Sequence, residues 1–404
     1  MEKNQRREFL KTSILGLTGA AFIPSALKPE PFIEPVQNDL PVLPYRILGK
    51  TGIKTPLISL GAGNVNDSNF IKASYHAGVK LFFSATYYGE GNNERLAGEG
   101  LKGLPRETFA AGTAVTPDGF DTNKGKFTSP LDVNAYIIKA EESIRRFGLG
   151  YLDFLLFPYA GKRDVMLNSS LLKALGQLKK EGKAKFVGIA THDNCAEAIR
   201  AAADSRFYDI VMTAYNFKTD DRDEINGAVA YAAKAGVGVV AMKTLAGVYE
   251  DKSRNKPVDS DIALKWVLQN ENIASVVSGM SSLEELTKNL AMIKNIKLSE
   301  QELKELAFAR SKSQNSLYCQ QCQRCIPQCS NKLEIPSIMR SYMYAYGYRN
   351  MEHAQHTLIT SRISGNPCSG CDVCSVKCRS GFDIKERIQD ISRLSNVPWE
   401  FLKA

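Results

Sequence analysis

Eight of the nine cysteines lie in two runs that share one spacing, Cys-x2-Cys-x2-Cys-x3-Cys. The runs are Cys319, Cys322, Cys325 and Cys329, followed by Cys368, Cys371, Cys374 and Cys378. Thiolates at this repeated spacing are typical ligands of [4Fe–4S] clusters. Disulfides are an alternative for an exported chain with eight paired cysteines. Zinc also uses Cys-x2-Cys pairs, but a four-ligand zinc site gives no reason for the third Cys-x2 step. The runs therefore predict two [4Fe–4S] clusters within residues 312–404.

The spacing of both runs resembles that of bacterial two-cluster ferredoxins, in which the fourth cysteine of each run binds the neighbouring cluster. This resemblance implies one ligand set of Cys319, Cys322, Cys325 and Cys378, and another of Cys368, Cys371, Cys374 and Cys329. Ferredoxins usually have proline after the fourth cysteine, where this chain has Ser330 and Arg379. Between the runs, residues 335–360 predict a helix whose aromatic stripe packs on the rest of the chain. The region resembles a helical ferredoxin domain.

The first 27 residues have the layout of a signal peptide, with a basic stretch, an apolar stretch at 14–23 and small residues near the end. The apolar stretch is shorter than the ~20 residues that a membrane-spanning helix needs, so a permanent transmembrane helix is the weaker interpretation. Arg6 and Arg7, followed by Glu-Phe-Leu-Lys, resemble the twin-arginine export motif. This resemblance implies export of a folded, cofactor-loaded protein to the periplasm or another extracytoplasmic compartment. The proline-rich residues 28–44 predict an extended tether.

Between residues 45 and 311, short apolar runs alternate with amphipathic stretches, as in repeated strand–helix units. Strands are predicted at residues 57–60, 81–83, 109–113, 154–157, 186–190, 210–213, 238–242 and 275–278. Helices are predicted at residues 133–147, 170–181, 225–235, 259–269 and 283–292. Eight such units match the ~250 residues typical of a (β/α)8 TIM barrel, whose active site lies at the carboxyl ends of the strands. The predicted fold class is α/β, a TIM barrel followed by an α-helical ferredoxin-like domain.

Three segments of the barrel resemble aldo/keto reductases. They are residues 45–52 (YRILGKTG), residues 236–243 (GVGVVAMK), and residues 278–289, which begin with Ser-Gly-Met-Ser-Ser and end at Asn289. In the family these segments form the opening hairpin, the seventh strand and part of the dinucleotide-binding site. The resemblance implies a nicotinamide cofactor, usually the 2′-phosphorylated one. It also implies a tyrosine general acid supported by aspartate, lysine and histidine.

The tyrosine is present, but its three partners are not. Tyr88 aligns with the proton donor, while Phe83, Ala114 and Pro158 take the places of the aspartate, the lysine and the histidine. An unperturbed phenol titrates near pH ~10, so a tyrosine without a neighbouring cation is a poor proton shuttle at neutral pH. Five polar residues near predicted strand ends are alternative candidates for these roles or ordinary rim residues, namely Ser84, Tyr87, Thr113, His192 and Lys243.

The nucleotide-binding positions of the family fall on Tyr215, Ser278, Gly279 and Asn289. By resemblance Asn289 would contact the adenine and Tyr215 would stack on the nicotinamide, although Tyr215 is equally a core residue. Ser281 stands where many members carry a basic residue for the 2′-phosphate, so a preference for the phosphorylated nucleotide is not implied.

Three functional interpretations stay open. The first is an oxidoreductase whose clusters exchange electrons between a redox partner protein and a small-molecule substrate at the barrel mouth. The second is an NAD(P)H-dependent aldehyde or ketone reductase that uses Tyr88. The third is a non-catalytic electron-transfer subunit.

Part of the net charge of +9 lies in the basic leader, and no basic run is interleaved with aromatic residues, so a nucleic-acid surface is not predicted.

Overall fold

The computed structural model describes residues 42–247, 258–311 and 316–402. The predicted signal peptide at 1–27 and nearly all of the predicted tether at 28–44 lie outside the described residues. Residues 40–404 cluster as one unit, which contains both the predicted barrel and the cysteine runs. Within the described ranges, no helix is long and apolar enough to cross a bilayer.

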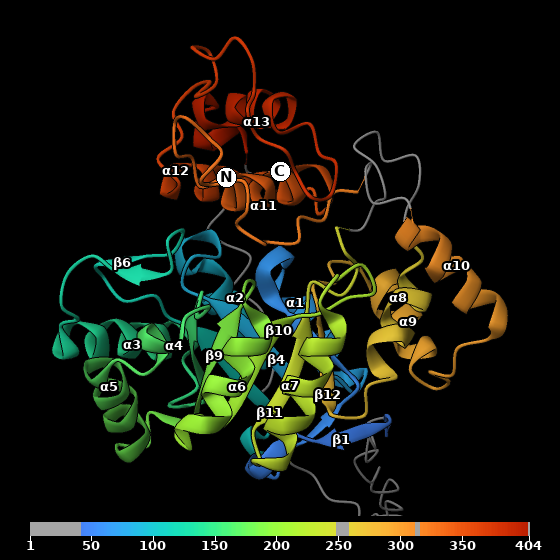
Figure 1. Ribbon diagram of the computed structural model, residues 1–404. Helices are drawn as coiled ribbons and strands as arrows, with labels where there is room; N and C mark the ends of the chain where they lie inside the picture. The colour runs from blue at the N-terminus through green and yellow to red at the C-terminus, as the bar shows by residue number, and fades with distance from the viewer. Residues whose placement is uncertain (1–41, 248–257, 312–315, 403–404) are drawn as a thin grey trace, which may run out of the picture. The chain divides into compact units, whose positions relative to one another are not determined.

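Eight parallel strands close into a barrel (Figure 1). In chain order they are β3 (Ile58–Gly61), β4 (Leu81–Ala85), β5 (Ala110–Ala114), β8 (Leu152–Pro158), β9 (Ala184–Thr191), β10 (Ile210–Ala214), β11 (Gly238–Met242) and β12 (Ile273–Ser278). Strand β12 pairs with β3, with Val276 opposite Ile58, and this pairing closes the barrel. The predicted α/β TIM-barrel fold is confirmed, and the apolar runs locate all eight strands.

Helices form a layer around the barrel (Figure 1). They are α1 (Ser68–His76), α2 (Asn92–Leu101), α3 (Val133–Phe147), α4 (Arg163–Met166), α5 (Ser169–Lys180), α6 (Cys195–Ser205), α7 (Arg222–Lys234), α8 (Ser260–Leu268), α9 (Leu283–Met292) and α10 (Glu300–Ser311). Side-chain caps fix where several of them begin. Asp132 accepts hydrogen bonds from two backbone N–H groups at the start of α3, and Ser282 accepts one at the start of α9.

A hairpin of β1 (Tyr45–Ile47) and β2 (Lys54–Pro56) precedes the barrel and packs against the start of β11. Gly49 in its turn has a φ of 52°, and a Cβ at this position would clash with the backbone of Gly238. Glycine is required here on both grounds. Leu48 is fully buried and joins the apolar side chains of the barrel interior. The hairpin thus covers the end at which the strands begin. The carboxyl ends of the strands form the barrel mouth.

The C-terminal region contains α11 (Ile335–Tyr346), α12 (Met351–Thr360) and α13 (Ile384–Ser392). The prediction of one helix over residues 335–360 was wrong, because the chain turns between α11 and α12. Gly347 allows the turn, since a Cβ there would clash with the backbone carbonyl of Gly247. Arg349 has a positive φ of 55°, and Asn350 caps α12 by accepting from the backbone N–H of His353.

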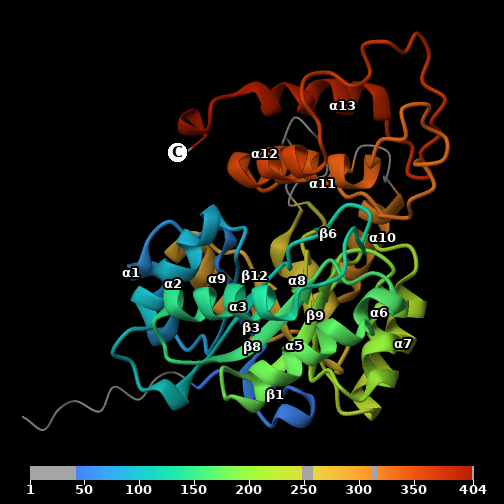
Figure 2. The same ribbon diagram turned by 90° about the vertical axis from the view of Figure 1, so that its left-hand side faces the viewer.

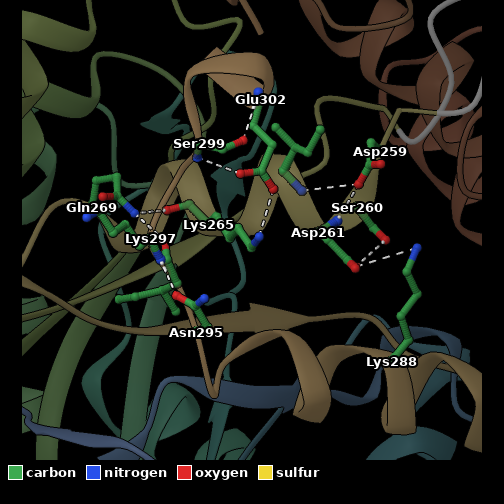
Figure 3. A network of polar contacts seen from close by, with 12 residues as sticks. Asp259, Ser260, Asp261, Lys265, Gln269, Lys288, Asn295, Lys297, Ser299 and Glu302 are labelled. Atoms are coloured by element: carbon green, nitrogen blue, oxygen red, sulfur yellow. Dashed lines mark hydrogen bonds and ion pairs between the residues drawn. The ribbon is translucent and has the colours of Figure 1, made fainter. Parts of the chain in front are cut away.

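A polar network holds α10, the last helix before the C-terminal region, against α8 (Figure 3). Lys265 of α8 donates to Glu302 of α10 at 2.7 Å. The same carboxylate accepts from the backbone N–H of Ser299 at 2.7 Å, while the Ser299 hydroxyl accepts from the Glu302 N–H. This reciprocal capping box fixes the start of α10 and its contact with the barrel.

Helices α11 and α12 lie over the barrel mouth in both views (Figures 1 and 2). Asn350 donates to the Gly63 carbonyl at 3.2 Å and to the Asn64 side chain at 2.8 Å. On another part of the rim, Gln323 donates to Asp193 at 2.9 Å. The C-terminal region therefore forms the upper wall of any site at the mouth.

Candidate active site and cysteine sets

Cys319, Cys322, Cys325 and Cys378 line one cavity in the C-terminal region. Its volume is about 20 Å³. Burial raises the pKa of the Cys319 thiol to about 12, and the neighbouring Cys325, Cys378 and Cys322 add to the rise. The fourth cysteine of the second run therefore lies beside the first three of the first run. A set of four thiols fits the donors that a [4Fe–4S] cluster needs.

The other four cysteines are also neighbours. Burial raises the pKa of the Cys368 thiol, and the nearby Cys371, Cys329 and Cys374 add to it. Within the described ranges, no three His, Cys, Asp or Glu side chains converge on a point that could hold one metal ion. The ligands of a cluster of several iron and sulfur atoms stand further apart than those of one ion. The two groups are those that the ferredoxin spacing predicts, and their ligation stays a prediction.

The positions of the three missing acid–base partners lie in the apolar interior of the barrel. Phe83 belongs to β4, Ala114 ends β5 and Pro158 ends β8. Phe83 and Ala114 are 4% and 5% exposed, and the Phe83 ring lies 5.8 Å from the ring of Phe154. None of the three side chains ionises or donates a proton. The strands thus give Tyr88 no acid–base partner at these positions.

Tyr88 follows β4 at the barrel mouth, below α12. Its ring approaches Gly63 so closely that a Cβ there would lie 3.1 Å away. The imidazole of His353, from α12, stands edge-on to the Tyr88 ring at 5.3 Å and stacks on the Tyr87 ring at 5.8 Å. Burial, followed by the neighbouring tyrosines, raises the pKa of Tyr88 well above its ordinary value. Tyr88 therefore stays protonated at neutral pH.

Three of the five alternative candidates lie at the mouth. The ring of Tyr87 is 5.0 Å from that of Tyr88. His192 follows β9 and stacks on Tyr159 at 5.8 Å, while Lys243 follows β11. Burial lowers the pKa of His192 well below its ordinary value, with Arg340 and Lys243 contributing, so this imidazole is neutral at neutral pH.

The other two candidates are placed elsewhere. Thr113 donates to the buried carboxylate of Glu94 on α2, which also receives a hydrogen bond from Arg146 of α3. The Ser84 hydroxyl is buried and has no hydrogen-bond partner among the described residues. The lone Cys195 is buried at the start of α6, and burial raises the pKa of its thiol to about 12.

A small cavity separates the barrel mouth from the first cysteine set. His192 and Lys243 line it from the barrel, and Cys319 and Arg340 line it from the C-terminal region. Its volume of about 10 Å³ has room for about one water molecule. Burial, followed by the charge of Arg340, lowers the pKa of Lys243 to about 7. A predicted cluster ligand and the barrel mouth thus line one cavity.

Ser278, Gly279 and Asn289 lie together, with the Asn289 amide donating to the Ser278 hydroxyl at 3.4 Å. The adjacent start of α9 is acidic. The Glu285 carboxylate accepts from the backbone N–H and the hydroxyl of Ser281 at 2.8 and 3.2 Å. Helix N-termini normally attract anions, but here a carboxylate of the chain already takes these hydrogen bonds. A 2′-phosphate would meet a negative charge at this position.

Tyr215 does not join these three residues. Its hydroxyl donates to Asn226 of α7 at 2.6 Å, and its ring packs 5.0 Å from the ring of Trp266 on α8. The side chain is therefore buried in the layer between strands and helices, which fits the core-residue interpretation.

Sequence reasoning missed the contribution of α11 and α12 to the mouth. Arg340, Tyr344 and His353 face the strand ends, and the rings of Tyr344 and His353 lie 4.2 Å apart. The aromatic stripe predicted at residues 335–360 was the available signal, but its tyrosines lie on two different faces of α11. Tyr342 and Tyr346 pack together at 4.5 Å, and Tyr346 donates to Asp390 of α13.

Comparisons with known proteins agree with this architecture. A model of the aldo/keto reductase family matches residues 63–261, and a model of a 4Fe-4S dicluster domain matches residues 318–383. L-galactose dehydrogenase of Arabidopsis thaliana is 26% identical over 290 residues, which are 61% of this chain and 87% of that protein. L-glyceraldehyde 3-phosphate reductase of Escherichia coli K12 is 24% identical over 319 residues, 65% of this chain and 91% of that protein.

Solved structures show the same barrel. The holo form of an aldo-keto reductase from Bacillus halodurans has a TM-score of 0.55 at 20% identity, over 66% of this chain and 96% of that one. An aldo-keto reductase from Klebsiella pneumoniae in complex with NADPH has a TM-score of 0.52 at 20% identity, over 67% of this chain and 96% of that one. The chain therefore joins an aldo/keto reductase domain to a 4Fe-4S dicluster domain, the combination of an iron–sulfur oxidoreductase.

Proposed function

We propose that this oxidoreductase is exported and that its two predicted [4Fe–4S] clusters exchange electrons between a partner protein and a small molecule at the barrel mouth. One observation carries the proposal. Cys319 lines both the cavity of the first cysteine set and the small cavity at the barrel mouth. A ligand of one cluster would therefore stand next to the place where a TIM barrel binds its substrate.

The residues of the chain have distinct tasks in this proposal. Cys319, Cys322, Cys325 and Cys378 would hold one cluster, and Cys368, Cys371, Cys374 and Cys329 the other. Such clusters, when bound, take up and release single electrons. Helices α11 and α12 cover the mouth (Figures 1 and 2). Arg340 supplies positive charge there, and His192 and Tyr88 supply polar groups without charge. Lys243, whose pKa is lowered to about 7, is charged in only about half of the molecules at neutral pH.

The lost acid–base partners favour this function over ordinary carbonyl reduction. Phe83, Ala114 and Pro158 can neither activate a tyrosine nor hold a carbonyl oxygen by a proton or a charge. The carboxylate of Glu285 also stands where the family would bind a 2′-phosphate. Both changes weaken the case for a nicotinamide-dependent reaction.

A second candidate function is NAD(P)H-dependent aldehyde or ketone reduction. It is favoured by the retained Tyr88 and by the His353 imidazole 5.3 Å from its ring. A histidine from α12 would then replace the histidine lost at Pro158. The dehydrogenase and reductase activities in the relatives' names agree with this alternative. A third candidate, a non-catalytic electron-transfer subunit, would use the cysteine sets alone.

Export rests on the first 27 residues. The Arg6-Arg7 motif fits a route that carries folded proteins, and a protein with preassembled clusters needs such a route. We place the domain boundaries at 27, 44 and 311, so that the barrel occupies residues 45–311 and the cluster domain residues 312–404.

An anaerobic redox titration tests the proposed function. The cluster-loaded chain would be mixed with an artificial one-electron donor, with NADH or with NADPH, and the iron–sulfur absorbance followed. Bleaching by the artificial donor, with reoxidation by a small-molecule acceptor, is expected. Reoxidation by a protein partner alone would favour the subunit function. Robust NADPH-dependent carbonyl turnover without any change in the clusters would overturn the proposal.

A further inference from the structure

Two polar side chains approach the sulfur of one predicted cluster ligand. The second cysteine set consists of Cys329, Cys368, Cys371 and Cys374. The Cys371 sulfur lies 3.9 Å from the Ser330 hydroxyl and 3.7 Å from the side-chain amide nitrogen of Asn331. A thiolate that binds iron has no proton to donate, so in the loaded protein both groups donate and Cys371 accepts. Hydrogen bonds to the sulfurs are among the features that set the reduction potential of an iron–sulfur cluster.

The Asn331 amide is held in place by a further hydrogen bond. It donates to the backbone carbonyl of Pro367 at 2.8 Å, and Pro367 directly precedes another ligand of the same set. An amide nitrogen has two N–H groups, so the one that Pro367 does not take is left for Cys371. From α13, the Lys385 ammonium donates to the backbone carbonyl of Asp372 at 3.0 Å. The loop that carries Cys371 is thus fixed relative to its donors.

The first cysteine set differs at the corresponding positions. Cys322 holds the place in the first run that Cys371 holds in the second. Arg379 follows the last cysteine of the second run, as Ser330 follows that of the first, but its guanidinium lies 3.4 Å from the Asp220 carboxylate. Among the residues that the structure describes, no side chain donates a hydrogen bond to the Cys322 sulfur. The pair of donors is therefore a property of the second set.

We infer that Ser330 and Asn331 are positioning residues, which act through Cys371 to raise the reduction potential of the cluster held by the second set. Reduction adds one electron and makes the thiolates more negative, so donors to a ligand sulfur stabilise the reduced state more than the oxidised one. The proline that ferredoxins usually have at the place of Ser330 could not donate in this way. The inference rests on the proposed function for the presence of the clusters, but not for the substrate or the partner.

The expected effect is moderate. Both donors are exposed, so water can take the place of a lost hydrogen bond. Ser330→Ala and Asn331→Ala should each shift the equilibrium toward the oxidised cluster about three-fold. The double variant should shift it about ten-fold, which is a potential lower by ~59 mV for one electron.

An anaerobic redox titration of the full, cluster-loaded chain measures both midpoint potentials. Dithionite supplies the electrons, and the EPR signals of the reduced clusters are the readout. In the variants one potential should fall and the other should stay. If both clusters titrate together in the wild type, the double variant should separate them. Ser330→Thr keeps the hydroxyl and should keep the wild-type potential.

Ser375→Ala is the matched control. Ser375 follows the ligand Cys374 as Ser330 follows Cys329, but its hydroxyl donates to the backbone carbonyl of Gln328 at 2.6 Å. The variant removes a hydrogen bond that fastens the same loop without removing a donor to a sulfur. Both potentials should therefore stay at their wild-type values.

Unchanged potentials in the double variant would overturn the inference. An equal shift in Ser375→Ala would overturn it as well, because the effect would then come from a loosened loop. A wild-type chain with about four iron atoms, held by the first set alone, would overturn both this inference and the two-cluster prediction. Failure of the substrate and partner assays described above would leave these potentials measurable, so the two failures can be told apart.

Discussion

We expect the wild-type protein to show only background nicotinamide-dependent carbonyl reduction. Removal of the Tyr88 hydroxyl should leave this rate unchanged. The variant Tyr88→Phe deletes the one member of the family's acid–base group that the chain retains. Its neighbours in the barrel, Phe83 and Ala114, are buried and apolar, and burial raises the pKa of the phenol well above its ordinary value. A phenol in this setting releases its proton only with difficulty.

The size of the effect distinguishes the two functions clearly. A positioned general acid typically contributes ~10²–10⁴-fold to the rate, which corresponds to about 3–5 kcal/mol of activation free energy. If Tyr88 were active with His353 as its partner, Tyr88→Phe would therefore cost at least two orders of magnitude. With no working partner, we expect a change of less than about two-fold.

The assay supplies NADH and NADPH with a panel of aldehydes and ketones and follows nicotinamide absorbance under anaerobic conditions. Tyr75→Phe is the control, because the Tyr75 hydroxyl contacts Thr108 at 2.6 Å, away from the mouth. Robust wild-type turnover that collapses in Tyr88→Phe and in His353→Phe, but not in Tyr75→Phe, would refute the reasoning. It would show that the C-terminal region restores the lost acid–base partner.

Three further predictions concern the clusters, export and stability. Anaerobically purified protein should hold about eight iron and about eight acid-labile sulfide per chain, and zinc without sulfide, or four disulfides by mass mapping, would contradict this. The double variant Arg6→Lys with Arg7→Lys should leave cluster-loaded precursor in the cytoplasm, as measured by fractionation, whereas unchanged export would point to another route. The hydrogen bond from Lys265 lowers the pKa of Glu302 from 4.5 to about 2. This ion pair should therefore stabilise the fold fully above pH 4.5 and lose its effect as the pH falls toward 2. Urea unfolding across that range should show a smaller decline in Lys265→Met, and an equal decline would contradict the assignment.

The barrel could be predicted from the sequence because each of its elements is defined by residues that are adjacent in the chain. Each strand is a short apolar run, and several helices have an amphipathic period with a cap such as Asp132, so neighbouring residues define these elements. The break between α11 and α12 was missed because it depends on a distant backbone, that of Gly247, against which Gly347 packs. Composition alone does not show such a contact.

Of the candidate site, only the residues that the barrel contributes could be predicted from the sequence. Strand-end residues such as His192 and Lys243 follow from the rule that TIM-barrel sites lie at the carboxyl ends of strands. Arg340 and His353 come from a separate region, and their place depends on which helix face packs on the mouth. For Tyr215 the sequence left two interpretations open, because a matching motif position does not show the direction in which the ring points.

The altered barrel and the added region are best understood together. The interior has lost its ionisable groups at Phe83, Ala114 and Pro158, while α11 and α12 bring a guanidinium and an imidazole to the same mouth. The two parts also share apolar packing, since Phe217 and Ala246 of the barrel belong to the core cluster of Tyr342 and Met343. A barrel deprived of residues 316–402 would expose this surface and lose Arg340 and His353 from the mouth. The proposed electron transfer therefore belongs at the junction between barrel and cluster region, where Cys319, Lys243 and Arg340 line one cavity.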